Sequence, residues 1–259
     1  MPIITLTTDW QTDDFYAGAI KGHIYSKCPD ARIIDITHKI EGFKSAHAAF
    51  ILKGAYPHFP AGTIHLLCVN SEITEQNIPL CICHNGQYFI GADIKSFGVL
   101  FNEKPDMVIG LDAANGLSMS TFPELTIFAE AACLLANGMP ATDLGFDITD
   151  EYSGLNLQPS VDRDSISGNI IYIDSYKNLI TDISKDLFRK ACNKRKFEIT
   201  VKSDIYKIER ICNTYSEVEI GELVAIFNSL GLLEIAMRNA NLATIANIDG
   251  TSRVIVKFK

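Results

Sequence analysis

Residues 3–22, IITLTTDWQTDDFYAGAIKG, decide the fold expected for the first half of the chain. Residues 3–8 are apolar or β-branched and predict a strand, and Phe15, Ala19 and Ile20 then recur at helical spacing. Asp9 follows where the strand should end. In an open α/β sheet, ligands bind just beyond the carboxyl ends of the strands. The stretch therefore predicts a strand–loop–helix unit in which Asp9 can hold a hydroxyl group or a cation.

Two further carboxylates, Asp13 and Asp14, stand where the helix should begin. Acidic side chains are favoured there by the free N–H groups and by the helix dipole. One interpretation makes Asp13 and Asp14 helix caps and Asp9 an ordinary loop residue. The other makes the stretch part of a binding site, and the stretch alone does not choose between them.

The rest of the first half continues to alternate strand and helix patterns, which favours a doubly wound α/β domain. Asn85-Gly86 joins two short apolar runs and predicts a hairpin. We expect a Rossmann-like domain over residues 1–150, with strands at 32–36, 63–69, 80–84 and 87–90 and helices at 45–55 and 128–136.

The second half of the chain has a different sequence pattern. Residues 151–167 are polar and turn-rich and predict a linker. Residues 168–259 predict a smaller, mainly antiparallel β domain with one helix at 185–192. Its strands are expected at 168–174, 179–183, 196–201, 223–227, 232–236 and 253–258.

Composition and charge indicate which classes of partner and which cellular compartment to expect. The chain has 259 residues and a net charge of −8, which argues against a nucleic-acid or anionic-membrane partner. No apolar run is long enough to span a bilayer, and the first residues do not resemble a signal peptide. The 7 cysteines are scattered without zinc-binding spacing, so we expect reduced thiols in a cytoplasmic protein.

Three segments carry further candidates. In THKIEGF, residues 37–43, Phe43 could stack on a flat ligand or simply tuck into a surface loop. In YIDSYKNLITD, residues 172–182, a carboxylate, a phenol ring and an amide follow a strand. They suit a polar ligand with an aromatic base, although on local evidence a β-turn built from Asp, Ser and Asn is the simpler explanation. In FNSLGLLEIA, residues 227–236, the polar loop could read an adenine edge or be only a hairpin turn.

Together the motifs TTDWQTDDFYAGAIKG, YIDSYKNLITDI and NSLGLLEIA resemble, in order and spacing, those of the S-adenosylmethionine hydroxide adenosyltransferase family, which includes fluorinases and chlorinases. The resemblance implies two domains and a homotrimer with nucleoside sites between subunits. It implies attack of water or hydroxide on the ribose C5′ of S-adenosylmethionine, giving adenosine and methionine, without metal or cofactor. By position, the resemblance implies that Asp9 would hold the ribose diol and that Phe43 would line the sugar pocket. Asp174 would contact the methionine amino group, Tyr176 would stack on adenine, and Asn178 would bind the adenine edge. Ser229 and the backbone after Arg238 would complete the adenine pocket.

The chain departs from the family on the side of the nucleophile. Asn70 stands where the family has a water-orienting Asp, and Pro123-Glu124-Leu125 stands where it has a His and an Arg. The family's Pro-Asp-Asn-Gly stretch is replaced at residues 92–95. Glu72 and Glu124 are carboxylates close in sequence to the vacated positions, so the candidate catalytic set is Asn70, Glu72 and Glu124.

Two other functions stay open. Loss of the water-orienting set favours a catalytically silent binder of S-adenosylmethionine or adenosine. The spacing of Asp9, Asp13 and Asp14 is also similar to the calcium-binding opening of nucleoside ribohydrolases, since carboxylate oxygens are the ligands that calcium prefers.

Overall fold

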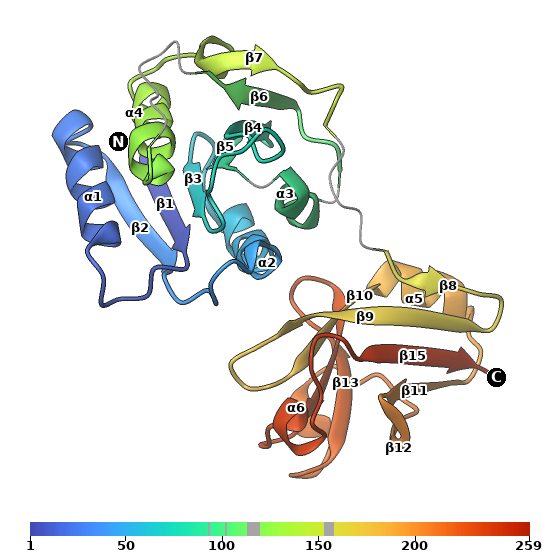
Figure 1. Ribbon diagram of the computed structural model, residues 1–259. Helices are drawn as coiled ribbons and strands as arrows, with labels where there is room; N and C mark the ends of the chain where they lie inside the picture. The colour runs from blue at the N-terminus through green and yellow to red at the C-terminus, as the bar shows by residue number, and fades with distance from the viewer. Residues whose placement is uncertain (93, 102, 113–119, 153–157) are drawn as a thin grey trace. The chain divides into compact units, whose positions relative to one another are not determined.

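The computed structural model describes residues 1–92, 94–101, 103–112, 120–152 and 158–259. The chain divides into two compact units, Met1–Asn156 and Leu157–Lys259 (Figure 1). Each unit has its own hydrophobic core, so each is described by itself.

The N-terminal unit is built on a mixed sheet whose described strands run in the order β2-β1-β3-β5-β4-β6-β7. β1, β2, β3 and β5 are mutually parallel, whereas β4 and β6 pair antiparallel to their neighbours. The predicted hairpin is confirmed, since β4 and β5 are joined at Asn85-Gly86. The strands are β1 (Ile3–Thr8), β2 (Arg32–Thr37), β3 (Ile64–Cys68), β4 (Leu80–His84), β5 (Gln87–Gly91), β6 (Met107–Leu111) and β7 (Gly145–Asp147).

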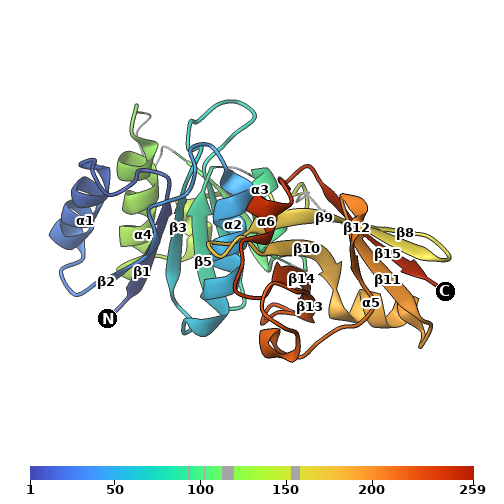
Figure 2. The same cartoon turned by 90° about the horizontal axis from the view of Figure 1, so that it is seen from below.

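Helices cover both faces of this sheet, which confirms the α/β prediction. α1 (Tyr16–Lys27) and α4 (Ala129–Ala136) pack with Ile4 and Leu6 of β1 in one core. α2 (Ser45–Ala55) and α3 (Ile94–Leu100) pack in a second core on the other face. Figure 2 shows these two pairs on opposite sides of β1, β3 and β5. Short helical turns lie at Tyr56–His58, Glu124–Phe128 and Ala141–Leu144.

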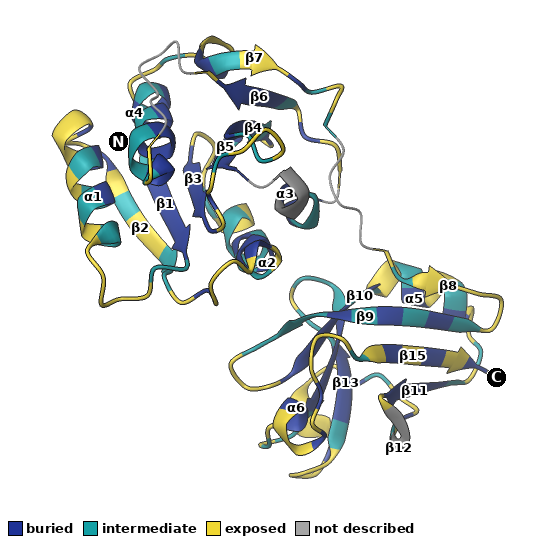
Figure 3. Ribbon diagram, viewed as in Figure 1, coloured by how far each residue is buried: buried dark blue, intermediate teal, exposed yellow. Residues whose placement is uncertain are grey.

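β1 is buried along almost its whole length, as its colouring in Figure 3 shows. Its apolar side chains enter one core, while Thr5 faces the other way and bonds the buried His65 on β3 at 2.8 Å. The second ring nitrogen of His65 bonds Gln87 on β5 at 2.7 Å. A strand buried on both faces explains why residues 3–8 read as a continuous apolar and β-branched run.

The structure contradicts one of the two interpretations of Asp13 and Asp14, namely that they cap α1. The helix begins at Tyr16 with Phe15 as its N-cap, without a side-chain cap and without acidic residues in its first turn. Asp13 and Asp14 lie in the preceding turn with exposed side chains. The loop runs past the predicted start before the backbone turns helical, so these carboxylates miss the free N–H groups.

The C-terminal unit is an antiparallel sheet of eight described strands, in the order β12-β11-β15-β9-β10-β14-β13, with β8 paired to β9. β12 and β13, at the two ends of this order, lie close together, so the sheet nearly closes into a barrel. This confirms the predicted β domain. The strands are β8 (Ser160–Val161), β9 (Ser165–Ile173), β10 (Leu179–Ser184), β11 (Phe197–Val201), β12 (Ser203–Ile208), β13 (Leu223–Phe227), β14 (Leu232–Met237) and β15 (Arg253–Phe258).

α5 (Lys185–Cys192) has the predicted bounds, and the Ser184 hydroxyl caps it by accepting the Leu187 N–H at 3.2 Å. A short α6 (Leu242–Ile245) and a 3-10 turn at Tyr215–Glu217 complete the unit. The polar segment predicted as a linker differs from expectation at its end, because β8 and the first residues of β9 lie within it. Ile166 there is buried, and pairing with β15 compensates for the polar sequence around it. Residues 153–157 of the segment lie outside the described residues.

No helix in the described ranges is long and apolar enough to cross a membrane. All 7 cysteines are free, and Cys83 is the one that is not fully buried.

Candidate functional site

Asp9 follows β1 at the carboxyl edge of the parallel strands and is tied to the loop that follows β2. Its Oδ2 accepts the backbone N–H of Phe43 at 3.2 Å. The two loops are held together by further bonds, from the Gln11 N–H to the His38 carbonyl at 2.7 Å and from the Ile40 N–H to the Thr8 carbonyl at 3.3 Å. The structure thus brings Asp9 and Phe43, two predicted site residues, into direct contact.

Three residues at this edge have left-handed backbone conformations, which residues other than glycine rarely adopt. They are Gln11 at φ 60°, Phe43 at φ 64° and Asn70 at φ 54°. Phe43 is also 82 % exposed, which is unusual for a large apolar ring. Strained backbone clusters at ligand sites, where the surrounding structure holds it in place. These loops therefore have the character of a binding edge with an aromatic side chain open to a ligand.

A buried carboxyl lies within reach of the charge of Asp9. Glu124 opens the π-helical turn Glu124–Phe128 and is only 8 % exposed. Burial raises the pKa of Glu124, and the negative charge of Asp9 raises it further, whereas the Ser71 hydroxyl lowers it. Burial also raises the pKa of the Cys68 thiol at the end of β3, with the charges of Glu124 and Asp9 acting in the same direction. The four side chains thus form one cluster at the ends of β1 and β3.

The other two predicted catalytic residues do not join this cluster. Asn70 and Glu72 are both exposed. The loop that carries them is organised by Asn77, whose side-chain amide donates to the carbonyl of Asn70 at 3.2 Å and to that of Glu72 at 2.6 Å. Ser71, between them, points inward and is 7 % exposed. Of the replaced stretch at 92–95, Asp93 lies outside the described residues.

In the C-terminal unit, Asp174, Tyr176 and Asn178 form one turn between β9 and β10. The Asp174 carboxylate accepts the backbone N–H of Asn178 at 2.8 Å and its side-chain amide at 3.2 Å. Tyr176 is 75 % exposed, and Lys177 has φ 68°. The turn therefore orders the carboxylate and the amide and leaves the phenol ring free to stack.

Ser229 and Arg238 lie at opposite ends of the β13–β14 hairpin. Ser229 is exposed in the turn between the strands, whereas Arg238 follows β14 and donates its Nη1 to the Val218 carbonyl at 2.5 Å. The backbone of Arg238 is bonded on both sides, by its N–H to Glu222 and by its carbonyl to Gly221, each at 2.9 Å. At about 3.3 Å per residue, the hairpin separates the two ends by about 20 Å.

A buried polar network that was not predicted from the sequence lies under the same hairpin. Glu234 is 4 % exposed, accepts the Tyr215 hydroxyl, and accepts the Asn228 amide at 3.2 Å. Burial and this bond to Glu234 raise the pKa of Tyr215. The Asn228 Oδ1 in turn accepts the N–H groups of Leu230 and Leu232, so the network shapes the turn that carries Ser229. A single Glu between the apolar residues of GLLEIA was the available signal.

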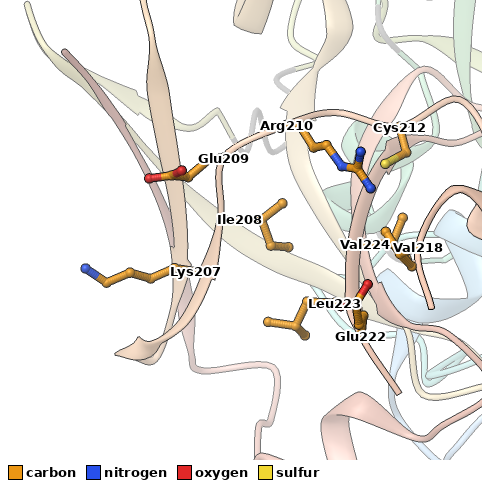
Figure 4. A pocket seen from close by; sticks show the side chains of 9 residues that line it. All are labelled: Lys207, Ile208, Glu209, Arg210, Cys212, Val218, Glu222, Leu223 and Val224. Atoms are coloured by element: carbon orange, nitrogen blue, oxygen red, sulfur yellow. The ribbon is translucent and has the colours of Figure 1, made fainter. Parts of the chain in front are cut away.

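A hollow of about 500 Å³ also opens in the C-terminal unit, where β12 and β13 approach each other (Figure 4). It contains no residue predicted for the site. It is lined by Lys207, Ile208, Glu209, Arg210, Cys212, Val218, Glu222, Leu223 and Val224. In the ranges that the structure describes, no group of three or more His, Cys, Asp or Glu side chains is arranged to hold a metal ion.

Comparison with known proteins gives the family. Residues 4–145 match the model of the SAM hydroxide adenosyltransferase N-terminal domain, and residues 168–255 match that of the C-terminal domain. An (R)-S-adenosyl-L-methionine hydrolase of Methanocaldococcus jannaschii is 31 % identical, with 96 % of this chain and 93 % of that protein aligned. A fluorinase of Nocardia brasiliensis is 25 % identical over 99 % of this chain and 97 % of that protein.

The crystal structure of an uncharacterized conserved protein from Thermotoga maritima has the same fold, with a TM-score of 0.85, 26 % identity, and coverage of 99 % of this chain and 100 % of that one. The family models cover both units, and the matched residues include Asp9 in the first unit and Asp174 to Asn178 in the second. This chain belongs to the SAM hydroxide adenosyltransferase family.

Proposed function

We propose that this protein binds S-adenosylmethionine and hydrolyses it at the ribose C5′, releasing adenosine and methionine. The observation that carries the proposal is the cluster at the ends of β1 and β3, where the charge of Asp9 at the strand edge reaches a buried carboxyl. The relative from Methanocaldococcus is named for the (R) epimer at sulfur, so we propose that epimer as the substrate.

This reaction requires few catalytic groups from the protein. The sulfonium is already a good leaving group, so no acid has to protonate it. The protein must hold the ribose, exclude bulk water and place one water in line with the C5′–S bond. A negatively charged strand edge also suits a substrate that carries a positive sulfonium beside its sugar.

A second candidate is a silent binder of S-adenosylmethionine or adenosine. It is supported by Asn70, which is exposed and cannot ionise, and by Pro123, which has neither a basic side chain nor an N–H to donate. Under this alternative the nucleoside-binding residues would be retained while water activation is lost.

Product analysis separates these functions. The purified protein is incubated with the (R) and (S) epimers of S-adenosylmethionine, with and without a chelator, and the products are separated by chromatography. Adenosine and methionine in equal amounts, unaffected by chelator, support the hydrolase. Binding of the (R) epimer without product supports the silent binder, and free adenine would contradict both.

We also propose that the protein is a homotrimer, because the candidate nucleoside-binding residues fall on both units and the family resemblance implies sites shared between subunits. Light scattering at micromolar concentration tests this, and a monomer there would contradict it.

A further inference from the structure

The inference concerns Glu124 and rests on the proposed function. Glu124 is 8 % exposed, yet no ion pair within the described ranges joins it to a Lys, Arg or His. Burying a carboxylate without a cationic partner is costly. Asp9 increases that cost, because its charge opposes the ionisation of Glu124. A backbone N–H and the Ser71 hydroxyl offset part of this cost, but no cation in the part of the chain that the structure describes does so. A role in the site is therefore the better explanation.

The second observation is Ser71. Its hydroxyl is buried beside the Glu124 carboxyl and makes no hydrogen bond of regular geometry with any described residue. A buried hydroxyl without a well-formed partner is costly, because it has lost its bonds to water. Ser71 reaches Glu124 because Asn70, at φ 54°, turns the chain at the end of β3. The hydroxyl and the carboxyl together form a polar spot at the bottom of the strand edge.

Aromatic packing holds Glu124 in this position. Phe122 lies edge-on against Trp10, with ring centroids 5.8 Å apart, and against Tyr16 at 5.1 Å. Trp10 directly follows Asp9, so this contact fixes the segment before Glu124 to the loop that carries Asp9. A π-helical turn then begins at Glu124 itself. Such turns are rare in proteins as a whole, but those that occur are often found at functional sites.

We propose that Glu124 is the general base of the hydrolysis and that Ser71 is the residue that positions its carboxylate. The carboxylate takes a proton from the bound water while the water oxygen forms its bond to C5′. The C5′–S bond breaks, and its electron pair stays on sulfur as the thioether of methionine. The product is adenosine, and Glu124 afterwards releases the proton to solvent.

Exposure sets Glu124 apart from the other candidate base. Glu72 is exposed, and its backbone carbonyl is bonded by Asn77 within the loop after β3. A base that is buried with a raised pKa takes a proton more readily than an exposed carboxylate, since efficiency is best when the pKa lies near the working pH.

The test compares Glu124→Gln with Glu75→Gln as the matched control, since Glu75 is an exposed carboxylate on the loop after β3 and both changes remove one negative charge and keep the shape. Hydrolysis is followed by adenosine formation, and adenosine affinity by calorimetry. We expect Glu124→Gln to lower kcat by about 10²–10⁴-fold and to change the adenosine Kd by less than about threefold. Glu75→Gln should leave both unchanged.

Two further readouts separate a base from a structural residue. The wild-type kcat should rise with pH as Glu124 ionises, and this limb should vanish in Glu124→Gln. Because Ser71 lowers the pKa of Glu124, Ser71→Ala should move the limb to higher pH while leaving adenosine affinity intact. Folding is checked by thermal melting. A raised pKa means that ionised Glu124 destabilises the fold above that pKa, so Glu124→Gln should melt no lower than wild type at pH 8.

The outcomes are distinct. If folded Glu124→Gln hydrolyses the (R) epimer within about threefold of the wild-type rate, Glu124 is not the base and the proposed function stands. If wild-type protein gives no adenosine from either epimer, both the proposed function and the role of Glu124 are refuted.

Discussion

Replacement of Asp9 by Ala tests the binding edge most directly. The Asp9 carboxylate has about four lone-pair positions, and one oxygen accepts the Phe43 N–H at 3.2 Å. Enough positions remain for two ribose hydroxyls. A hydrogen bond to a charged group contributes about 1.5–3 kcal/mol. The site is half-buried, so we take the low end, where one lost bond weakens binding about tenfold and two weaken it on the order of 100-fold.

The assay is calorimetric titration with adenosine and with 2′-deoxyadenosine. If Asp9 holds the diol, wild-type protein should prefer adenosine, and Asp9→Ala should lose both affinity and this preference. Asp14→Ala is the control, because Asp14 is an exposed carboxylate on the same loop and its removal changes the net charge equally. The variant also loses the tether to Phe43, so circular dichroism and melting must show that it is folded.

Two results would refute the reasoning. One is an adenosine affinity in folded Asp9→Ala within about twofold of wild type. The other is a variant that binds weakly yet still prefers adenosine to 2′-deoxyadenosine, since the diol would then be read by another group.

Two further predictions concern the second unit and the core. Tyr176→Ala should weaken adenosine binding by about 1–3 kcal/mol, the usual contribution of stacking on a base, whereas Tyr25→Ala, which removes another exposed phenol ring, should not; equal affinities in calorimetry would contradict the stacking role. Burial lowers the pKa of His65 from 6.5 to about 4, so the neutral ring is favoured in the fold and stability is lost as the pH falls below 6.5. Urea unfolding should show that His65 accounts for about 3 kcal/mol of the loss between pH 7 and pH 4. The loss should be smaller by that amount in His65→Gln and unchanged in His58→Gln, which alters an exposed ring, and parallel pH curves for all three proteins would contradict the assignment.

Local pattern was sufficient for most of the elements. The strand at Ile3–Thr8, the helices at Ser45–Ala55 and Lys185–Cys192 and the strand at Arg253–Phe258 have the bounds that periodicity and turn residues predict. The turn from Asp174 to Asn178 was also within reach of the sequence, because its bonds join residues four apart. The hairpin at Asn85-Gly86 follows from two residues that accept left-handed backbone.

Other features depend on contacts between distant segments. The order of the sheet, in which the antiparallel β4 lies between β5 and β6, is set by pairing free energies that no window of sequence contains. Asp13 and Asp14 match the composition of a helix start, but the packing of Tyr16 and Trp10 on Phe122 accompanies a start two residues later.

The candidate site likewise combines features that the sequence predicts with features that depend on tertiary contacts. The sequence already showed Asp9 at a position that the family resemblance retains, and Glu72 and Glu124 as carboxylates near vacated family positions. Only the tertiary structure separates them, because burial and neighbouring charge depend on which loops meet at the ends of β1 and β3. There Glu124 meets Ser71 and Asp9, while Glu72 remains in solvent. Residue type is encoded locally, but the environment that sets its pKa and its chemistry is created by segments brought together when the sheet forms.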